Sequence, residues 1–390
     1  MWYSVPALEF RWYEMKGVLL NNFVEQCLEQ RRMAMQRDTN SVITRFELCM
    51  DYHRDSSQIN RWLSIAAQPH LQELEVNMMS ESPCYCLPQV VLNLTSLTVL
   101  NLDGVKLQDC SHVNLPSLKS LSLRDVLVKD EVLHNLVLGC PAIQNLVIMV
   151  VNALSYIEIS SSSLKHLDID ADLDEIQVDA INLESFVCFG TCNYYIASCK
   201  KLSSLSLTAA YFPLHEDLEN IISGFPLLES LTLAGGSIVD VRHPNLKVLV
   251  LERSDKEDNN NISIDAPNLV SFTYSEEDTL PQILVNSPNL LETNISLKLY
   301  LEGRTMEWYV NMLNFLSSFD CSKSMSLNLH SEESVIFPET LRKITHYCPL
   351  PNLRHLKVKT RCVQRESDLE NSLRWLAPFL ETLSIEQSVE

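Results

Sequence analysis

Glycine and basic residues are scarce in this chain. It has 8 glycines in 390 residues, and 30 basic residues stand against 50 acidic ones, which gives a net charge of -20 at pH 7. An acid excess of this size repels phosphate backbones and argues against nucleic-acid binding. So few glycines leave little material for a phosphate-binding loop, and no GxSxG or HExxH motif occurs. We therefore expect no enzyme and no catalytic residue.

Long apolar runs are also missing. No stretch approaches the roughly 18 apolar residues of a membrane span, and the N-terminus lacks a basic region followed by an apolar segment. We expect an intracellular protein of the cytoplasm and/or nucleus, with free thiols rather than disulfides. Cys140, Cys199 and Cys348 then act as small buried apolar groups. The cysteine clusters near residues 84–86 and 188–199 lack the CxxC pairs of a zinc site.

One pattern, LxxLxL, recurs along nearly the whole chain, for example in residues 115–123 (LPSLKSLSL), 225–233 (FPLLESLTL) and 243–251 (HPNLKVLVL). Successive starts lie 18 to 34 residues apart, and the nine steps from Leu97 to Leu290 average about 21, which is typical of leucine-rich repeats. The fifteen candidate starts are Ile43, Leu71, Leu97, Leu118, Ile143, Leu164, Leu183, Leu202, Leu228, Leu246, Leu269, Leu290, Ser324, Leu353 and Leu380. Because no unit can bury its leucines alone, the pattern predicts a stacked solenoid with a long binding surface.

The spacing within a unit predicts one short strand. Apolar residues three and five positions after the start alternate as in a strand with one buried face. Helical periodicity occurs between several strands, in residues 59–67, 130–139, 216–224, 308–319 and 340–347. We therefore predict an α/β leucine-rich-repeat solenoid, or horseshoe, with parallel strands on the concave face and helices or irregular turns on the convex face. Units of 18 or 19 residues leave no room for a helix, so extended or turn-like connectors are expected on the convex side from Leu164 to Leu202.

Two features depart from the ordinary repeat. Asn or Cys usually stands eight residues after the start and satisfies backbone groups in the turn, but no unit here has Asn at that position. Either other groups satisfy these turns or the solenoid is irregular. The units at Leu290, with Thr293 at its second apolar position, and at Ser324 are poor matches.

The segment DIDADLDE has the alternating carboxylates of a calcium loop, at Asp168, Asp170, Asp172 and Asp174. The required Gly is replaced by Leu173, and the twelfth position is Asp rather than a bidentate Glu. We interpret the first two carboxylates as solvent-facing strand residues followed by a loop. No metal and no cofactor are predicted.

Short motifs in a fixed order resemble one family. Residues 2–10 (WYSVPALEF) are similar to the LWxSVPxLxF segment that follows the F-box in plant F-box/LRR proteins, and residues 23–31 and 43–48 resemble the next helix and first strand. Residues 350–385 resemble the FBD-type extension of some members. The resemblance implies a post-F-box segment and linker helix in 1–35, the leucine-rich-repeat solenoid in 36–300, and FBD-like repeats that continue the solenoid in 301–390.

The hydrophobic LPxxxLxxI opening of an F-box is not found in this sequence. The resemblance thus implies the substrate-recognition part of an SCF-type ubiquitin ligase receptor, which would join a Skp-type adaptor and cullin only with a complete F-box upstream. The chain then represents a truncated gene model, a fragment, or a product that binds targets without delivering them. Alternatives are an F-box-less scaffold and a small-molecule or hormone co-receptor, which requires a basic cluster approached only by Lys357, Lys359 and Arg361.

The candidate partner-binding side chains lie two, four and six residues after the starts, between the core leucines. They form a surface that runs from acidic to basic along the chain, and its expected occupant is a protein, not a nucleic acid or a membrane. These candidates are Glu73, Glu75, Asn101, Asp103, Arg124, His166, Asp168, Asp170, Glu252, His355, Lys357 and Lys359. For any single one, an ordinary solvated strand residue is the competing interpretation.

Overall fold

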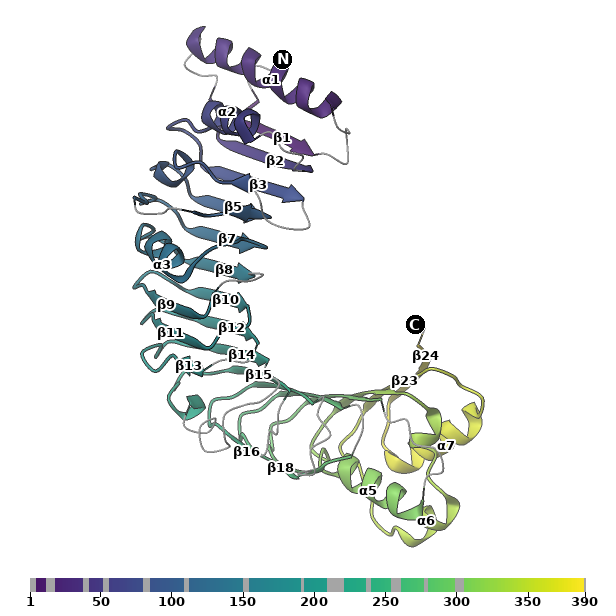
Figure 1. Cartoon of the computed structure of the whole chain (residues 1–390). Helices are drawn as coiled ribbons and strands as arrows, with labels where there is room; N and C mark the ends of the chain where they lie inside the picture. Colours follow the sequence, from purple (N-terminus) through teal and green to yellow (C-terminus); the bar gives the residue numbers. More distant parts are fainter. Residues whose placement is uncertain are drawn as a thin grey trace. The chain divides into compact units, whose positions relative to one another are not determined.

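The chain forms two compact units, Met1–Lys200 and Lys201–Glu390, each built on parallel strands stacked in chain order (Figure 1). The computed structural model describes residues 5–11, 18–37, 42–51, 56–79, 85–108, 112–149, 154–190, 193–208, 221–235, 240–253, 261–276, 280–298 and 305–388.

The first unit has its main strands in the order β1, β2, β3, β5, β7, β8, β10 and β12, all parallel neighbours. Their bounds are Ala7–Arg11, Arg45–Asp51, Glu73–Met79, Val99–Asp103, Ser120–Arg124, Asn145–Met149, His166–Asp170 and Ser185–Phe189. The connecting segments hold α1 (Val18–Arg37), α2 (Ser56–Ala66), η2 (Val91–Asn93) and α3 (Asp130–Leu138). They also hold the pair β4 (Tyr85–Cys86) and β6 (Val105–Lys106), and a small parallel sheet of β9 (Tyr156–Ser160), β11 (Glu175–Asp179) and β13 (Asn193–Tyr195).

The second unit repeats this plan with β14, β15, β17, β19, β21, β22, β23 and β24. Their bounds are Ser204–Thr208, Ser230–Ala234, Val248–Glu252, Ser271–Glu276, Glu292–Leu297, Ser324–Leu329, His355–Thr360 and Thr382–Gln387. The connectors hold a small parallel sheet of β16 (Asp240–Arg242), β18 (Asn261–Asp265) and β20 (Gln282–Asn286). They also hold α5 (Met306–Ser317), η3 (Glu332–Ser334), α6 (Glu339–Ile344) and α7 (Glu366–Leu376).

The core sits under the alternating apolar positions of these strands. In one repeat, Leu97, Leu100 and Leu102 are at most 1% exposed, while the strand residues between them reach solvent. Neighbouring repeats align these leucines, since Leu100 pairs with Leu121 in the parallel register. Each repeat therefore buries its leucines against the next, and the chain is an α/β leucine-rich-repeat solenoid.

Most predicted connectors are confirmed. Helices α2, α3, α5 and α6 lie where the helical periodicity indicated, and the short strands β11 and β13 serve as the extended connectors expected from Leu164 to Leu202. The helix expected in 216–224 falls largely outside the described residues. In the part that is described, residues 221–223 are helical. Strand β1 and helix α7 were not predicted. The boundaries proposed at residues 35 and 300 stay predictions.

The repeat start at Ser324 was wrong by two residues. Strand β22 aligns Ser324 with Glu292, so the residue opposite the starting Leu290 is Ser322. In the frame of the other repeats the two core positions are Met325 and Leu327, and the predicted Leu327 and Leu329 are both buried as well. The repeat replaces its first leucine by a serine that is 1% exposed, which hid the frame from the hydrophobic pattern.

The strands of several repeats end in a left-handed residue seven positions after the start. Gly104, Asp125, Gly190 and Gly235 have φ of 66°, 45°, 114° and 85°. A Cβ on Gly104 would lie 2.0 Å from the carbonyl oxygen of Met78, so glycine is required there both for φ and for space.

An asparagine ladder does exist, but one residue before the repeat start. In the second unit, Asn245 and Asn268 donate through Nδ2 to the carbonyl oxygens of Pro226 and Pro244 in the preceding repeat, at 2.9 and 2.8 Å. The same bond is made by Asn289 to Pro267, by Asn352 to Asp320, and in the first unit by Asn182 to Ser162. These bonds satisfy carbonyls in the turns before the strands.

Candidate interaction surface

The open face of each sheet is the set of strand side chains that point away from the buried leucines. All twelve predicted residues lie on such a face, at strand positions that are exposed or partly exposed. They divide between the units: those from Glu73 to Asp170 belong to the first unit, and those from Glu252 to Lys359 to the second.

The open face of β3 to β12 is acidic. It carries five carboxylates, at Glu73, Glu75, Asp103, Asp168 and Asp170, and among the described side chains of this face Arg124 is the one lysine or arginine. We call this set the acidic face. Its net charge favours a cationic partner.

Two carboxylates of the acidic face have raised pKa values. Burial raises the pKa of Asp103, and the nearby Asp125 raises it further, while Arg124 acts in the opposite sense. Burial and the neighbouring Asp170 likewise raise the pKa of Asp168. The Oδ1 atom of Asp168 is buried and has no hydrogen-bond partner among the described residues. A cationic side chain placed beside either carboxylate would favour its charged form.

Apolar side chains flank the two aspartates of β10. The parallel register places Val147 and Val187 on either side of Asp168, and Met149 and Phe189 on either side of Asp170. Phe189 is 40% exposed. This alternation of carboxylates and apolar groups suits side chains such as Lys and Arg, whose aliphatic stems pack on apolar surface while the charge meets an acid.

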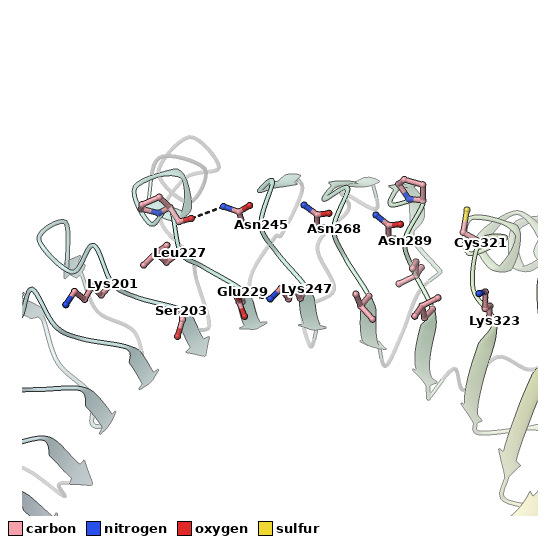
Figure 2. A pocket seen from close by; sticks show the side chains of 15 residues that line it. Lys201, Ser203, Leu227, Glu229, Asn245, Lys247, Asn268, Asn289, Cys321 and Lys323 are labelled. Atoms are coloured by element: carbon pink, nitrogen blue, oxygen red, sulfur yellow. Dashed lines mark hydrogen bonds and ion pairs between the residues drawn. The ribbon is translucent and has the colours of Figure 1, made fainter.

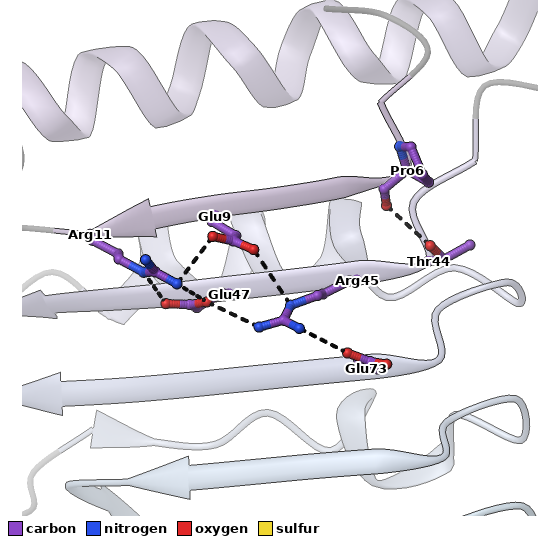
Figure 3. A network of polar contacts seen from close by, with 7 residues as sticks. All are labelled: Pro6, Glu9, Arg11, Thr44, Arg45, Glu47 and Glu73. Carbon is purple, nitrogen blue, oxygen red and sulfur yellow. Dashed lines mark hydrogen bonds and ion pairs between the residues drawn. The ribbon is translucent and has the colours of Figure 1, made fainter.

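Strands β1, β2 and β3 hold an ion-pair network on the open face of the first unit (Figure 3). Arg11 donates through Nη2 to Glu47 Oε2 at 2.8 Å and contacts Glu9 at 3.1 Å. Arg45 lies 3.5 Å from Glu47 and 3.2 Å from Glu73. The Glu47 side chain is 6% exposed, and its hydrogen bond from Arg11 lowers its pKa. The predicted residue Glu73 is therefore already partnered, unlike Asp168 Oδ1.

The predicted basic end of the surface is compensated. Lys357 contacts Glu386 at 2.7 Å and Lys359 contacts the same carboxylate at 4.0 Å, and the hydrogen bond from Lys357 lowers the pKa of Glu386. His355 shares a 2.9 Å hydrogen bond with Thr382 Oγ1. Serine and threonine occupy most of the remaining open-face positions in the second unit. This face is polar but close to neutral.

Sequence reasoning missed Glu386 and, apart from Glu73, the residues of the Arg11 network. Glu386 stands six residues after the start at Leu380, so the rule that selected Lys359 already pointed to it. Glu9 and Arg11 escaped because β1 has no leucine at the usual start. Glu47 was passed over although it lies four residues after Ile43.

Within the described ranges, no group of three or more His, Cys, Asp or Glu side chains is placed to hold a metal ion. Asp168 and Asp170 lie on strand β10 and Asp172 and Asp174 follow it. The described helices include none with the length and apolar character needed to cross a membrane.

Comparison with known proteins agrees with the repeat pattern. Residues 59–206 match the family model of the LRR repeats of FBD-associated F-box protein At5g56370. In Arabidopsis thaliana, F-box/FBD/LRR-repeat protein At5g22670 is 23% identical over 325 residues, which is 76% of this chain and 70% of that protein. F-box/FBD/LRR-repeat protein At2g05300 is 25% identical over 395 residues, which is 87% of this chain and 86% of that protein.

A further match is shorter. F-box/LRR-repeat protein 25 of the same plant is 25% identical over 171 residues, which is 44% of this chain and 62% of that protein. The chain is a leucine-rich-repeat solenoid that is similar to plant F-box/FBD/LRR-repeat proteins.

Proposed function

We propose that this chain recognises a protein target on the open faces of its sheets and acts as the substrate-recognition part of an SCF-type ubiquitin ligase receptor. Its similarity to proteins named for an F-box and leucine-rich repeats supports this role. The observation that carries the recognition step is the acidic face, where five carboxylates stand against Arg124.

The acidic face indicates what the target presents. Its strands β3 to β10 span about 20 Å at a spacing of about 4.8 Å between neighbours, which is enough for an extended segment of several residues. Asp168 and Asp170 lie at one end, between apolar neighbours on β8 and β12. A target segment rich in Lys or Arg would gain charge contacts and bury its aliphatic stems on the same strands.

Recognition is tested by reversing charge on one face at a time. Asp168→Lys with Asp170→Lys alters the acidic face, and Glu158→Lys with Asp179→Lys makes the same change on the exposed positions of the small sheet of β9 and β11. Quantitative affinity capture from plant cells should recover at least one protein with the wild type and the Glu158/Asp179 variant but not with the Asp168/Asp170 variant. Equal recovery by all three would refute recognition by this face.

The ligase step has its own readout. A target that binds through the acidic face should become less abundant when the chain is co-expressed from its full transcript, which has to supply the F-box that the adaptor requires, and a proteasome inhibitor should restore it. A Skp-type adaptor should co-purify in the same experiment. If the target binds but its abundance is unchanged and no adaptor is recovered, the chain is a scaffold and the ligase role is wrong, while recognition stands.

A further inference from the structure

A groove of about 930 Å³ runs along the edge of the second unit where its strands begin (Figure 2). One wall is formed by the turns that carry the asparagine ladder, and the other by the first residue after each repeat start. Figure 2 shows Lys201, Lys247 and Lys323 spread along it. We call this feature the lysine groove; it is separate from the open face.

The charge of the lysine groove is opposite to that of the chain as a whole. Its lining includes three lysines and one carboxylate, Glu229, whereas the chain carries a net charge of -20. Lys247 contacts Glu229 at 2.7 Å, but both side chains are more than half exposed. An exposed pair of this kind is weak and exchanges readily with an incoming carboxylate. Lys323 has no ion pair with any described residue.

Apolar side chains lie between two of these lysines. The strands follow one another as β17, β19, β21 and β22, and the residues before them are Lys247, Val270, Leu291 and Lys323. Val270 and Leu291 both line the groove, and they are 38% and 40% exposed. Along this edge, two apolar side chains therefore lie between two lysines.

We infer that the lysine groove binds an extended segment of a partner protein in which two carboxylates flank apolar residues. Three strand spacings separate Lys247 from Lys323, which is about 14 Å at about 4.8 Å per spacing. An extended chain advances about 3.3 Å per residue, so the two carboxylates stand about four residues apart. Their charges meet Lys247 and Lys323, and the apolar residues between them cover Val270 and Leu291.

The polar wall of the groove suits a peptide backbone. Asn245, Asn268 and Asn289 are held one per repeat by bonds from Nδ2 to the preceding turn, which leaves each side-chain carbonyl oxygen for a further donor. A backbone N–H of an extended segment is such a donor. This row fixes direction and depth, while the lysines select the acidic side chains.

Peptide display on the whole chain tests the inference without a known partner. A library of random peptides about 12 residues long is selected against the wild type and counted by sequencing. The expected consensus has two acidic positions about four residues apart with apolar residues between them, as the strand spacing requires. The best peptide, made with Gln in place of both acids, should bind about tenfold more weakly, and rising salt should weaken the acidic form.

Variants then assign the site. Lys247→Gln and Lys323→Gln should each weaken the selected peptide about three- to fivefold. Lys343→Gln is the matched control, since Lys343 is an exposed lysine on α6 that pairs with Glu339 outside the groove, and it should leave the affinity unchanged. Selection without acidic enrichment would overturn the inference. Acidic peptides that bind the groove variants as tightly as the control would also overturn it, and neither outcome bears on the acidic face.

Discussion

Thr293 and Ser322 form a buried hydroxyl pair between two repeats, with Thr293 Oγ1 donating to Ser322 Oγ at 3.0 Å. Both residues are 1% exposed and occupy positions that leucine fills elsewhere. Ser322 also lies within hydrogen-bonding distance of the carbonyl oxygens of Leu291 and Ser324, at 3.3 and 2.9 Å. The two repeats that match the leucine pattern worst are therefore joined by a polar contact. The buried hydroxyl of one repeat is hydrogen-bonded to the buried hydroxyl of the other.

Breaking this pair from both sides should cost less than the sum of the two single losses. Ser322→Ala removes the acceptor of Thr293, and the orphaned buried hydroxyl should lower the free energy of unfolding by about 1–2 kcal/mol. Thr293→Val removes the donor. The double variant should lose less than the sum, with a coupling of about 0.5–1 kcal/mol in urea unfolding. Thr273→Val, on the open face of β19, is the control and should change little. Strict additivity would contradict the pairing.

The left-handed strand ends give a pair of opposite predictions. Gly104→Ala places a Cβ against the Met78 carbonyl at a positive φ, and should lower the free energy of unfolding by about 2–4 kcal/mol. Asp125 occupies the equivalent position with φ of 45°, so Asp125→Gly should relieve strain and stabilise by up to about 1 kcal/mol. Thermal and urea unfolding measure both. Destabilisation by Asp125→Gly would show that its side chain matters more than its backbone.

Loss of Arg11 should make stability less dependent on pH in the acidic range. The pKa of Glu47 is lowered in the folded chain, so its contribution is full above its unfolded pKa of about 4.3 and disappears as the pH falls. Arg11→Met leaves that buried carboxylate with a weaker partner and should cost about 1–3 kcal/mol at pH 7. The difference from the wild type should shrink as the pH falls below the unfolded pKa of about 4.3, and it should disappear once the pH lies below the lowered pKa of folded Glu47, where the carboxyl is protonated in both proteins.

Urea unfolding of both proteins at several pH values measures this difference. Arg374→Met, which breaks the exposed pair with Glu370 on α7, is the matched control and should show no such trend. A difference between Arg11→Met and the wild type that stays constant from pH 7 to pH 3 would mean that Arg11 acts through packing rather than charge.

The repeat pattern predicted the fold well because a single physical rule governs it. A stacked parallel sheet buries the apolar residue at the repeat start and those three and five residues after it. Leu97, Leu100 and Leu102 therefore locate β5 without further information. The rule failed at Ser322, where a hydroxyl pair replaces leucine, and at β1, where no leucine marks the start. Both cases depend on a partner distant in sequence, which periodicity does not contain.

The candidate surface was predictable in position but not in chemistry. Alternation showed which strand residues point outward, and the acidic face follows from that list. Whether a charge is already paired depends on the neighbouring strand: Glu386 compensates Lys357, while Asp168 Oδ1 has no described hydrogen-bond partner. The lysine groove lies on turn residues outside the strand pattern, so strand periodicity alone does not reveal it.

The displaced asparagine ladder should add a small, separable increment of stability at each repeat. Asn268→Ala removes one bond to the Pro244 carbonyl, and should cost about 0.5–1 kcal/mol in urea unfolding. Because each rung joins only two adjacent repeats, Asn245→Ala, Asn268→Ala and Asn289→Ala together should cost about 2 kcal/mol. Asn294→Ala, an exposed asparagine on the open face of β21, is the control and should change little.

Hydrogen exchange locates the effect of the same variants. Amides in the turns that hold the ladder should exchange faster in the triple variant, whereas amides of β21 and β22 should keep their protection because the strand ladders are intact. If the triple variant unfolds at the same urea concentration as Asn294→Ala, water satisfies the proline carbonyls equally well and the ladder contributes no stability. If it loses protection throughout the second unit, the rungs hold the repeats together cooperatively rather than one pair at a time.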